Sequence, residues 1–138
     1  MKKKIAIVTG ADNKYFPFLK NLVLSLNDSN VLEICDLCIL MVDEENNYIA
    51  DIDKFLNKKK KVSFNLKLFF DEKKNWHKLL TERPFLKDHF PGYEKYIWLD
   101  ADTEVLDSQG IKNLIVSTKC QARFIINHIY LFWNRFFG

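Results

Sequence analysis

Ile5-Ala6-Ile7-Val8 is an uninterrupted apolar run that ends at Thr9-Gly10. Such a run is typical of a strand in a parallel sheet, where helices bury both faces. From Tyr15 onward, apolar residues recur at intervals of three and four, which predicts an amphipathic helix. These apolar residues are Phe18, Leu19, Leu22, Val23 and Leu26. The beginning of the chain therefore predicts a strand followed by a helix, as in an α/β domain.

The alternation of strand and helix patterns continues along the chain. Apolar or alternating runs predict further strands at about 33–42, 62–70 and 96–99. Helical spacing predicts a helix over 48–56, and 76–90 is typical of a helical or mixed segment. We therefore expect an α/β domain with a mostly parallel sheet flanked by helices.

Length and composition fit one globular domain. The 138 residues are close to the ~150 of an average domain, and 48% hydrophobic with 28% charged residues is ordinary for such a protein. The net charge of +3 is spread evenly, so the sequence predicts no nucleic-acid partner. The lysine runs 2–4 and 58–61 each precede an apolar segment and are interpreted as solvated turns.

The cysteines and the N-terminus indicate a reducing compartment. Cys35 and Cys38 lie in one predicted strand, where positions three apart point to opposite faces and cannot share a metal. We expect buried free thiols. The apolar stretch before Asp12 is too short for a signal peptide, so a cytoplasmic location is expected.

The composition changes after residue 107. Residues 108–138 contain no Asp or Glu, and 124–137 is rich in aromatic side chains. Asn127, His128, Asn134 and Arg135 interrupt the apolar run, which predicts that it does not span a membrane. The pattern permits an amphipathic helix on a membrane surface or a partner protein, and a core or interface helix is the favoured alternative.

Asp100-Ala101-Asp102 directly follows the apolar run at 96–99. On an extended backbone residues i and i+2 face the same way, so Asp100 and Asp102 can converge at the carboxyl end of the sheet. Two carboxylates with room for water and phosphate suit Mn²⁺ or Mg²⁺ beside a diphosphate.

Thr9-Gly10-Ala11-Asp12 and Tyr15 form a second candidate group. Gly10 permits close backbone approach, Asp12 can accept hydrogen bonds from a base or sugar, and Tyr15 offers a ring for stacking. These features indicate a nucleotide pocket. Two structural alternatives stay open: Tyr15 and Phe16 starting the buried face of the helix, and Asp12 capping that helix. Dinucleotide and P-loop motifs are absent from the sequence.

The segments VTGADNKY and YEKYIWLDADTEVLD, with Arg83 before the second, resemble nucleotide-sugar transferases of the GT-A fold, most closely glycosyltransferase family 8. The resemblance implies a Rossmann-like sheet and a UDP-sugar donor. It also implies three groups of site residues: Ala11, Asp12 and Tyr15 around uracil and ribose, Arg83 at the diphosphate and donor sugar, and Asp100 with Asp102 on Mn²⁺ (or Mg²⁺). Asp100 would also lie near the donor's ribose or sugar, and Ala101 would be a further nucleotide-sugar-binding residue.

The resemblance covers about residues 3–107. We expect residues 1–107 to form the donor-binding part and 108–138 to be a truncated or atypical apolar segment. Lys14 stands where the family usually has Asn before the tyrosine. The family's later half, which supplies a third metal ligand and the acceptor wall, has no counterpart in 108–138. His128 is the one histidine after Asp102 and is more typical of packing, as are His77 and His89 of structural positions. We expect this chain alone not to transfer sugar.

The expected function is hexosyl transfer from a UDP-sugar to a sugar, lipid-linked or protein acceptor. A nucleotidyltransferase that makes a nucleotide-sugar is one alternative, although 11–16 lacks the usual glycine-rich loop. A remnant that binds a nucleotide or a partner protein without turnover is the other.

Overall fold

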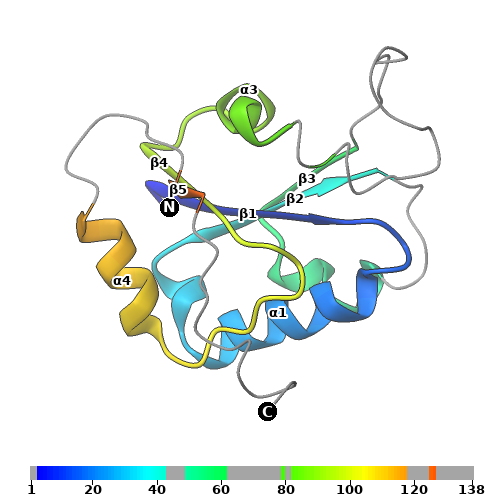
Figure 1. Ribbon diagram of the computed structural model, residues 1–138, viewed down its shortest axis with the longest axis horizontal. Helices are drawn as coiled ribbons and strands as arrows, with labels where there is room; N and C mark the ends of the chain where they lie inside the picture. The colour runs from blue at the N-terminus through cyan, green and yellow to red at the C-terminus, as the bar shows by residue number, and fades with distance from the viewer. Residues whose placement is uncertain (1–2, 43–48, 62–78, 80–81, 118–124, 127–138) are drawn as a thin grey trace.

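The computed structural model describes residues 3–42, 49–61, 79, 82–117 and 125–126. Its strands are β1 (Ile5–Ala11), β2 (Asp36–Met41), β3 (Lys58–Lys61), β4 (Lys95–Trp98) and β5 (Ile125–Ile126). Its α-helices are α1 (Phe16–Asp28), α3 (Leu86–His89) and α4 (Ser108–Ser117). Short 3-10 helices lie at Val31–Glu33, Ile49–Asp51, Asp53–Phe55 and Arg83–Phe85. The predicted α/β class is confirmed (Figure 1).

The five strands form one sheet in the order β3-β2-β1-β4-β5, and every neighbouring pair is parallel. β1 is central and pairs along Ala6–Ala11 with β2 and along Ile5–Val8 with β4. The order reverses between β1 and β4, as it does in Rossmann-like doubly wound sheets. The predicted mostly parallel sheet is therefore confirmed.

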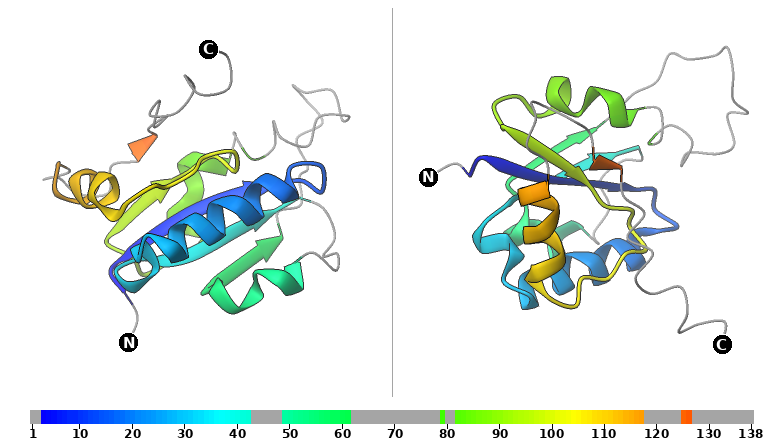
Figure 2. Two further views of the ribbon diagram at one scale, coloured as in Figure 1. Left: turned by 90° about the horizontal axis from the view of Figure 1, so that it is seen from below. Right: turned by 60° about the vertical axis from the view of Figure 1, so that its left-hand side comes forward.

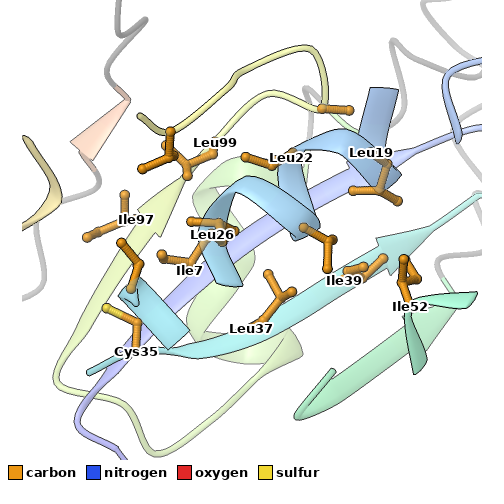
Figure 3. Packing of buried hydrophobic residues seen from close by; sticks show 14 of the residues in the cluster. Ile7, Leu19, Leu22, Leu26, Cys35, Leu37, Ile39, Ile52, Ile97 and Leu99 are labelled. Atoms are coloured by element: carbon orange, nitrogen blue, oxygen red, sulfur yellow. The ribbon is translucent and has the colours of Figure 1, made fainter. Parts of the chain in front are cut away.

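Helix α1 covers one face of the sheet, as the left view of Figure 2 shows. Its buried side chains Leu19, Leu22 and Leu26 pack against Ile7 of β1 and Ile39 of β2 (Figure 3). Burial of each such side chain contributes roughly 1.5–3 kcal/mol, so this layer supplies much of the drive to fold. Among the apolar residues that predicted this helix, Phe18 is the one that is not buried, because it is 50% exposed.

Helix α3 covers the opposite face (Figure 1). There Leu86 and Phe90 pack with Val8 of β1 and with Tyr96 and Trp98 of β4. Alternate residues of β1 and β4 thus enter different layers, which explains why their sequences are apolar throughout.

The lysine run 58–61 was wrongly interpreted as a turn, because it forms β3. β3 is at the edge of the sheet, where lysines are favoured since they hinder pairing with another chain. The strand predicted at 62–70 lies outside the described residues.

The helix predicted over 48–56 is replaced, in its described part, by the two 3-10 helices Ile49–Asp51 and Asp53–Phe55. Asn57 gives the reason. Its backbone N–H donates to the Leu37 carbonyl, and its side-chain oxygen accepts from the Leu37 N–H, both at 2.8 Å. These two hydrogen bonds hold Asn57 beside β2, so β3 begins at the next residue and leaves no room for a longer helix.

Residues after 107 pack with the preceding part where they are described. Ile111 of α4 is buried in the same layer as Ile97, and β5 pairs with β4. Ile125–Ile126 is therefore strand, which corrects the helix considered over 124–137 at these two positions, while 127–138 lies outside the described residues.

Cys35 and Cys38 are both buried, as expected. Cys35 lies just before β2 in the layer of α1, and Cys38 lies in the layer of α3. The sheet separates them, which confirms that they cannot share a metal. In the described part of the chain, no helix has the length and apolar character needed to cross a bilayer.

Candidate functional site

A pocket of about 390 Å³ opens where β1 and β4 end. A volume of this size is typical of sites for small molecules. The pocket is lined by Gly10, Ala11, Asp12, Tyr15, Leu79, Arg83, Trp98, Asp100, Ala101 and Asp102. All seven residues predicted for the site line this one pocket.

The strand order accounts for the position of the pocket. Gly10 and Ala11 are the last residues of β1, and Trp98 is the last residue of β4. β2 follows β1 in the chain and lies on one side of it, whereas β5 follows β4 and lies on the other side. The strand order therefore reverses between β1 and β4, and the pocket lies at this reversal. Ligands of open parallel sheets bind at such a point.

The β1 side of the pocket is a short turn that leads into α1. Asp12 Oδ1 accepts a hydrogen bond from the Tyr15 backbone N–H at 2.9 Å, and the Asp12 carbonyl accepts from the same N–H at 3.1 Å. Asp12 thus holds the turn before the helix, but it does not cap α1, because the N-cap is Tyr15 and no side chain bonds the first turn. The capping alternative is therefore wrong, and Asp12 lines the pocket.

Tyr15 and Phe16 point in different directions. Phe16 is buried in the core, while Tyr15 is 40% exposed and lines the pocket. The alternative that both start the buried face of α1 is therefore wrong for Tyr15 and correct for Phe16. The Tyr15 ring also contacts exposed Phe18, with ring centroids 5.8 Å apart.

The β4 side carries a charged pair. Arg83 Nη2 donates to Asp100 Oδ1 at 2.5 Å, and only 12% of the Arg83 side chain is exposed. The Trp98 indole N–H donates to the same oxygen at 2.8 Å. The Arg83 guanidinium also lies over the Trp98 ring, 4.9 Å from its centroid. Arg83 Nε is buried and makes no hydrogen bond among the described residues.

Asp100 and Asp102 belong to a turn, closed by a 3.0 Å hydrogen bond from the Thr103 N–H to the Asp100 carbonyl. This corrects the extended backbone assumed for them, because β4 ends at Trp98. The turn still leaves both residues in the pocket wall, with Ala101 buried between them and Asp102 exposed.

The donor chemistry of this turn suits a hard cation. Carboxylate oxygens are the ligands that Mg²⁺ and Mn²⁺ prefer, and both ions keep positions open for water and phosphate. No group of three or more His, Cys, Asp or Glu side chains able to hold a metal occurs among the described residues. Among the described residues, Asp100 and Asp102 are the carboxylates that this turn offers to such an ion.

Two lining residues were not predicted. Trp98 was assigned only to the strand, and Leu79 only to the 76–90 segment. Trp98 lies two positions before Asp100, the spacing at which strand residues share a face, so that spacing was the available signal. Leu79 approaches Gly10 from a distant segment, and the sequence carries no comparable signal for it.

The remaining predicted positions do not join the pocket. His89 is half-buried and contacts Glu82, consistent with a structural role. Lys14 is exposed. His77 and His128 lie outside the described residues.

The sequence was also compared with models of known protein families and with curated proteins, and neither comparison gives a match. The geometry of the pocket is consequently the main basis for assigning a function.

Proposed function

We propose that this chain forms the donor-binding part of a GT-A glycosyltransferase that uses a UDP-sugar and a divalent metal ion. The observation that carries the proposal is the pocket at the β1/β4 crevice, which brings together an exposed aromatic ring, a mostly buried arginine and the carboxylates of Asp12, Asp100 and Asp102. These groups match the three parts of a nucleotide-sugar, namely base, diphosphate and sugar.

Stacking supports the assignment of the base. The exposed Tyr15 ring offers an apolar face at the β1 side, and a nucleobase stacked on such a ring gains roughly 1–3 kcal/mol. The nearby Asp12 carboxylate is an acceptor for an N–H of the base or a hydroxyl of the ribose.

Charge supports the assignment of the diphosphate. Arg83 is mostly buried and presents a planar fork of donors, which fits phosphate oxygens. A diphosphate would be repelled by Asp100 and Asp102 without a cation between them. A bound Mn²⁺ or Mg²⁺ would act as a Lewis acid that stabilises negative charge on the departing diphosphate.

The proposed reaction exchanges one bond for another at the anomeric carbon. The bond from this carbon to the diphosphate oxygen breaks, and a bond to an acceptor hydroxyl oxygen forms. The electron pair of the broken bond stays on UDP, and the proton of the acceptor hydroxyl is released, so the products are the glycosylated acceptor, UDP and one proton. Arg83 stabilises the charge on the leaving group, and Tyr15 with Asp12 holds the nucleoside in place.

Titration calorimetry with UDP tests the proposal. We expect UDP to bind with Mn²⁺ present and to lose its affinity when a chelator is added. Asp102→Asn should weaken binding roughly tenfold or more, since interactions with charged groups contribute ~1.5–3 kcal/mol. Glu104→Gln is the matched control, because Glu104 is an exposed carboxylate two residues away that does not line the pocket. Equal UDP affinity with and without chelator would refute the metal assignment.

The same titration tests two of the alternative functions. A nucleotidyltransferase should bind UTP with a sugar phosphate and release pyrophosphate. A remnant that binds only a partner protein should bind neither UDP nor UTP, whereas a remnant that binds a nucleotide without turnover would bind UDP as well.

A further inference from the structure

Trp98 contacts both members of the Arg83–Asp100 ion pair in the pocket. Its ring lies beneath the Arg83 guanidinium, and its indole N–H donates to Asp100 Oδ1 at 2.8 Å. Arg83 Nη2 donates to the same oxygen. One side chain therefore contacts both the cation and the anion of this pair.

Trp98 is itself held firmly. It ends β4, is only 5% exposed, and packs in the layer of α3 with Val8, Tyr93 and Tyr96. Its backbone pairs with Val8 of the central strand and with Ile126 of β5. A side chain fixed in this way can hold flexible neighbouring side chains in one orientation.

The Arg83 and Asp100 side chains both have rotational freedom that a fixed neighbour can restrict. The arginine side chain has many rotamers, and a surface that holds its planar group reduces the freedom it must lose on binding a ligand. The Asp100 carboxylate rotates about its terminal bond, and two donors on one oxygen fix that rotation. Trp98 can supply both restraints at once.

We infer that Trp98 is a positioning residue of this site, with its ring seating Arg83 and its indole N–H orienting the Asp100 carboxylate. The inference deepens the proposed function and rests on it for the identity of the ligand. It assigns to Trp98 more than the filling of the core, which requires no indole N–H.

Trp98→Phe separates these two roles, because it keeps an aromatic ring and removes the N–H. We expect this variant to bind UDP with Mn²⁺ about tenfold more weakly than the wild type, as for loss of a hydrogen bond to a charged group. Tyr96→Phe is the matched control. Tyr96 lies two residues earlier in β4, is equally buried, and donates its hydroxyl to the Phe90 carbonyl at 2.7 Å, away from the pocket. It should lose stability and keep its UDP affinity.

A double-mutant cycle tests whether Trp98 acts through Asp100. The Trp98→Phe and Asp100→Ala substitutions should not be additive, and the double variant should bind UDP about as weakly as Asp100→Ala alone. Additive losses, or equal UDP affinity in the wild type and Trp98→Phe, would overturn the inference.

NMR of the ligand-free protein gives a second test that needs no UDP. The Trp98 indole N–H signal, assigned by its loss in Trp98→Phe, should shift and exchange faster with solvent in Asp100→Ala. Glu104→Gln should leave it in place. An indole signal that is unaffected by Asp100→Ala would overturn the inference. Absence of UDP binding in the wild type would instead refute the proposed function, so the two failures are distinguishable.

Discussion

Gly10 lies so close to Leu79 that a Cβ atom at position 10 would be 2.8 Å from Leu79 Cδ2. The same Cβ would be 2.8 Å from the Leu40 carbonyl oxygen. The leucine methyl can rotate away, but the carbonyl belongs to the paired backbone of β2 and cannot. Gly10→Ala should therefore reduce the free energy of unfolding by about 1–3 kcal/mol, as measured by urea denaturation.

Gly110 provides the matched control for this prediction. It lies in α4, and a Cβ there would meet no atom within 4 Å. Gly110→Ala should increase the free energy of unfolding by about 0.5–1 kcal/mol, since alanine favours a helix over glycine. A Gly10→Ala variant as stable as the wild type would contradict the close packing described for β1.

The Tyr15 ring should matter more for UDP binding than its hydroxyl. Tyr15→Phe should keep the affinity measured with Mn²⁺, and Tyr15→Ala should lose at least about fivefold, since stacking on an aromatic ring contributes roughly 1–3 kcal/mol. Phe85→Ala is a suitable control, because Phe85 is 50% exposed and does not line the pocket. Equal binding by Tyr15→Ala and Phe85→Ala would exclude a stacking role.

Tyr93 should stabilise the protein through Asp36. Its hydroxyl donates to Asp36 Oδ2 at 2.9 Å, and Asp36 is only 6% exposed. Tyr93→Phe leaves this carboxylate with the Lys3 ammonium 3.9 Å away. We expect a loss of about 1–3 kcal/mol in the free energy of unfolding. Tyr15→Phe, which removes an exposed hydroxyl, should change it by less than about 0.5 kcal/mol, and equal losses would disprove the role of Tyr93.

Alkaline pH should destabilise the protein through Cys35. Burial raises the pKa of the Cys35 thiol from 9.0 to about 12, although the Lys3 charge opposes the shift. Between these values the folded thiol keeps its proton and the unfolded thiol loses it. Stability should therefore fall as pH rises above 9, by up to ~1.4 kcal/mol per pH unit. Urea denaturation at pH 8.5, 9.5 and 10 should show a shallower decline for Cys35→Ala, and parallel curves would contradict this assignment.

The buried strands were predictable because helices cover both of their faces. β1 begins at Ile5, where the apolar run predicted it, and β4 (Lys95–Trp98) is shifted by one residue from the predicted 96–99. Both sequences are largely apolar. β3 was not predictable in the same way. An edge strand pairs on one side only, so the lysine run 58–61 could join the sheet without an apolar pattern.

The sequence predicted which residues lie at the pocket, but it did not predict how they contact one another. The order of the strands places Asp12 and Asp100 at one end of the sheet, as the alternation of strands and helices indicates. The contact of Arg83 with Asp100 depends on how a separate segment packs, and it was not predicted, since the resemblance implied only that Arg83 belongs to the site. The hydrogen bond from Trp98 depends on the orientation of one ring, which no sequence pattern specifies.

The pairing of β4 with β1 has a consequence for the order of events during synthesis. β1, α1, β2 and β3 lie early in the chain and can associate as soon as residue 61 has left the ribosome. The pocket cannot form at that stage. Ile5 can pair with Lys95, and Arg83 can contact Asp100, only after these later residues have been synthesised. Until then the β4 side of the central strand is an open edge, and a nascent chain stalled before β4 should be prone to aggregation and to capture by chaperones.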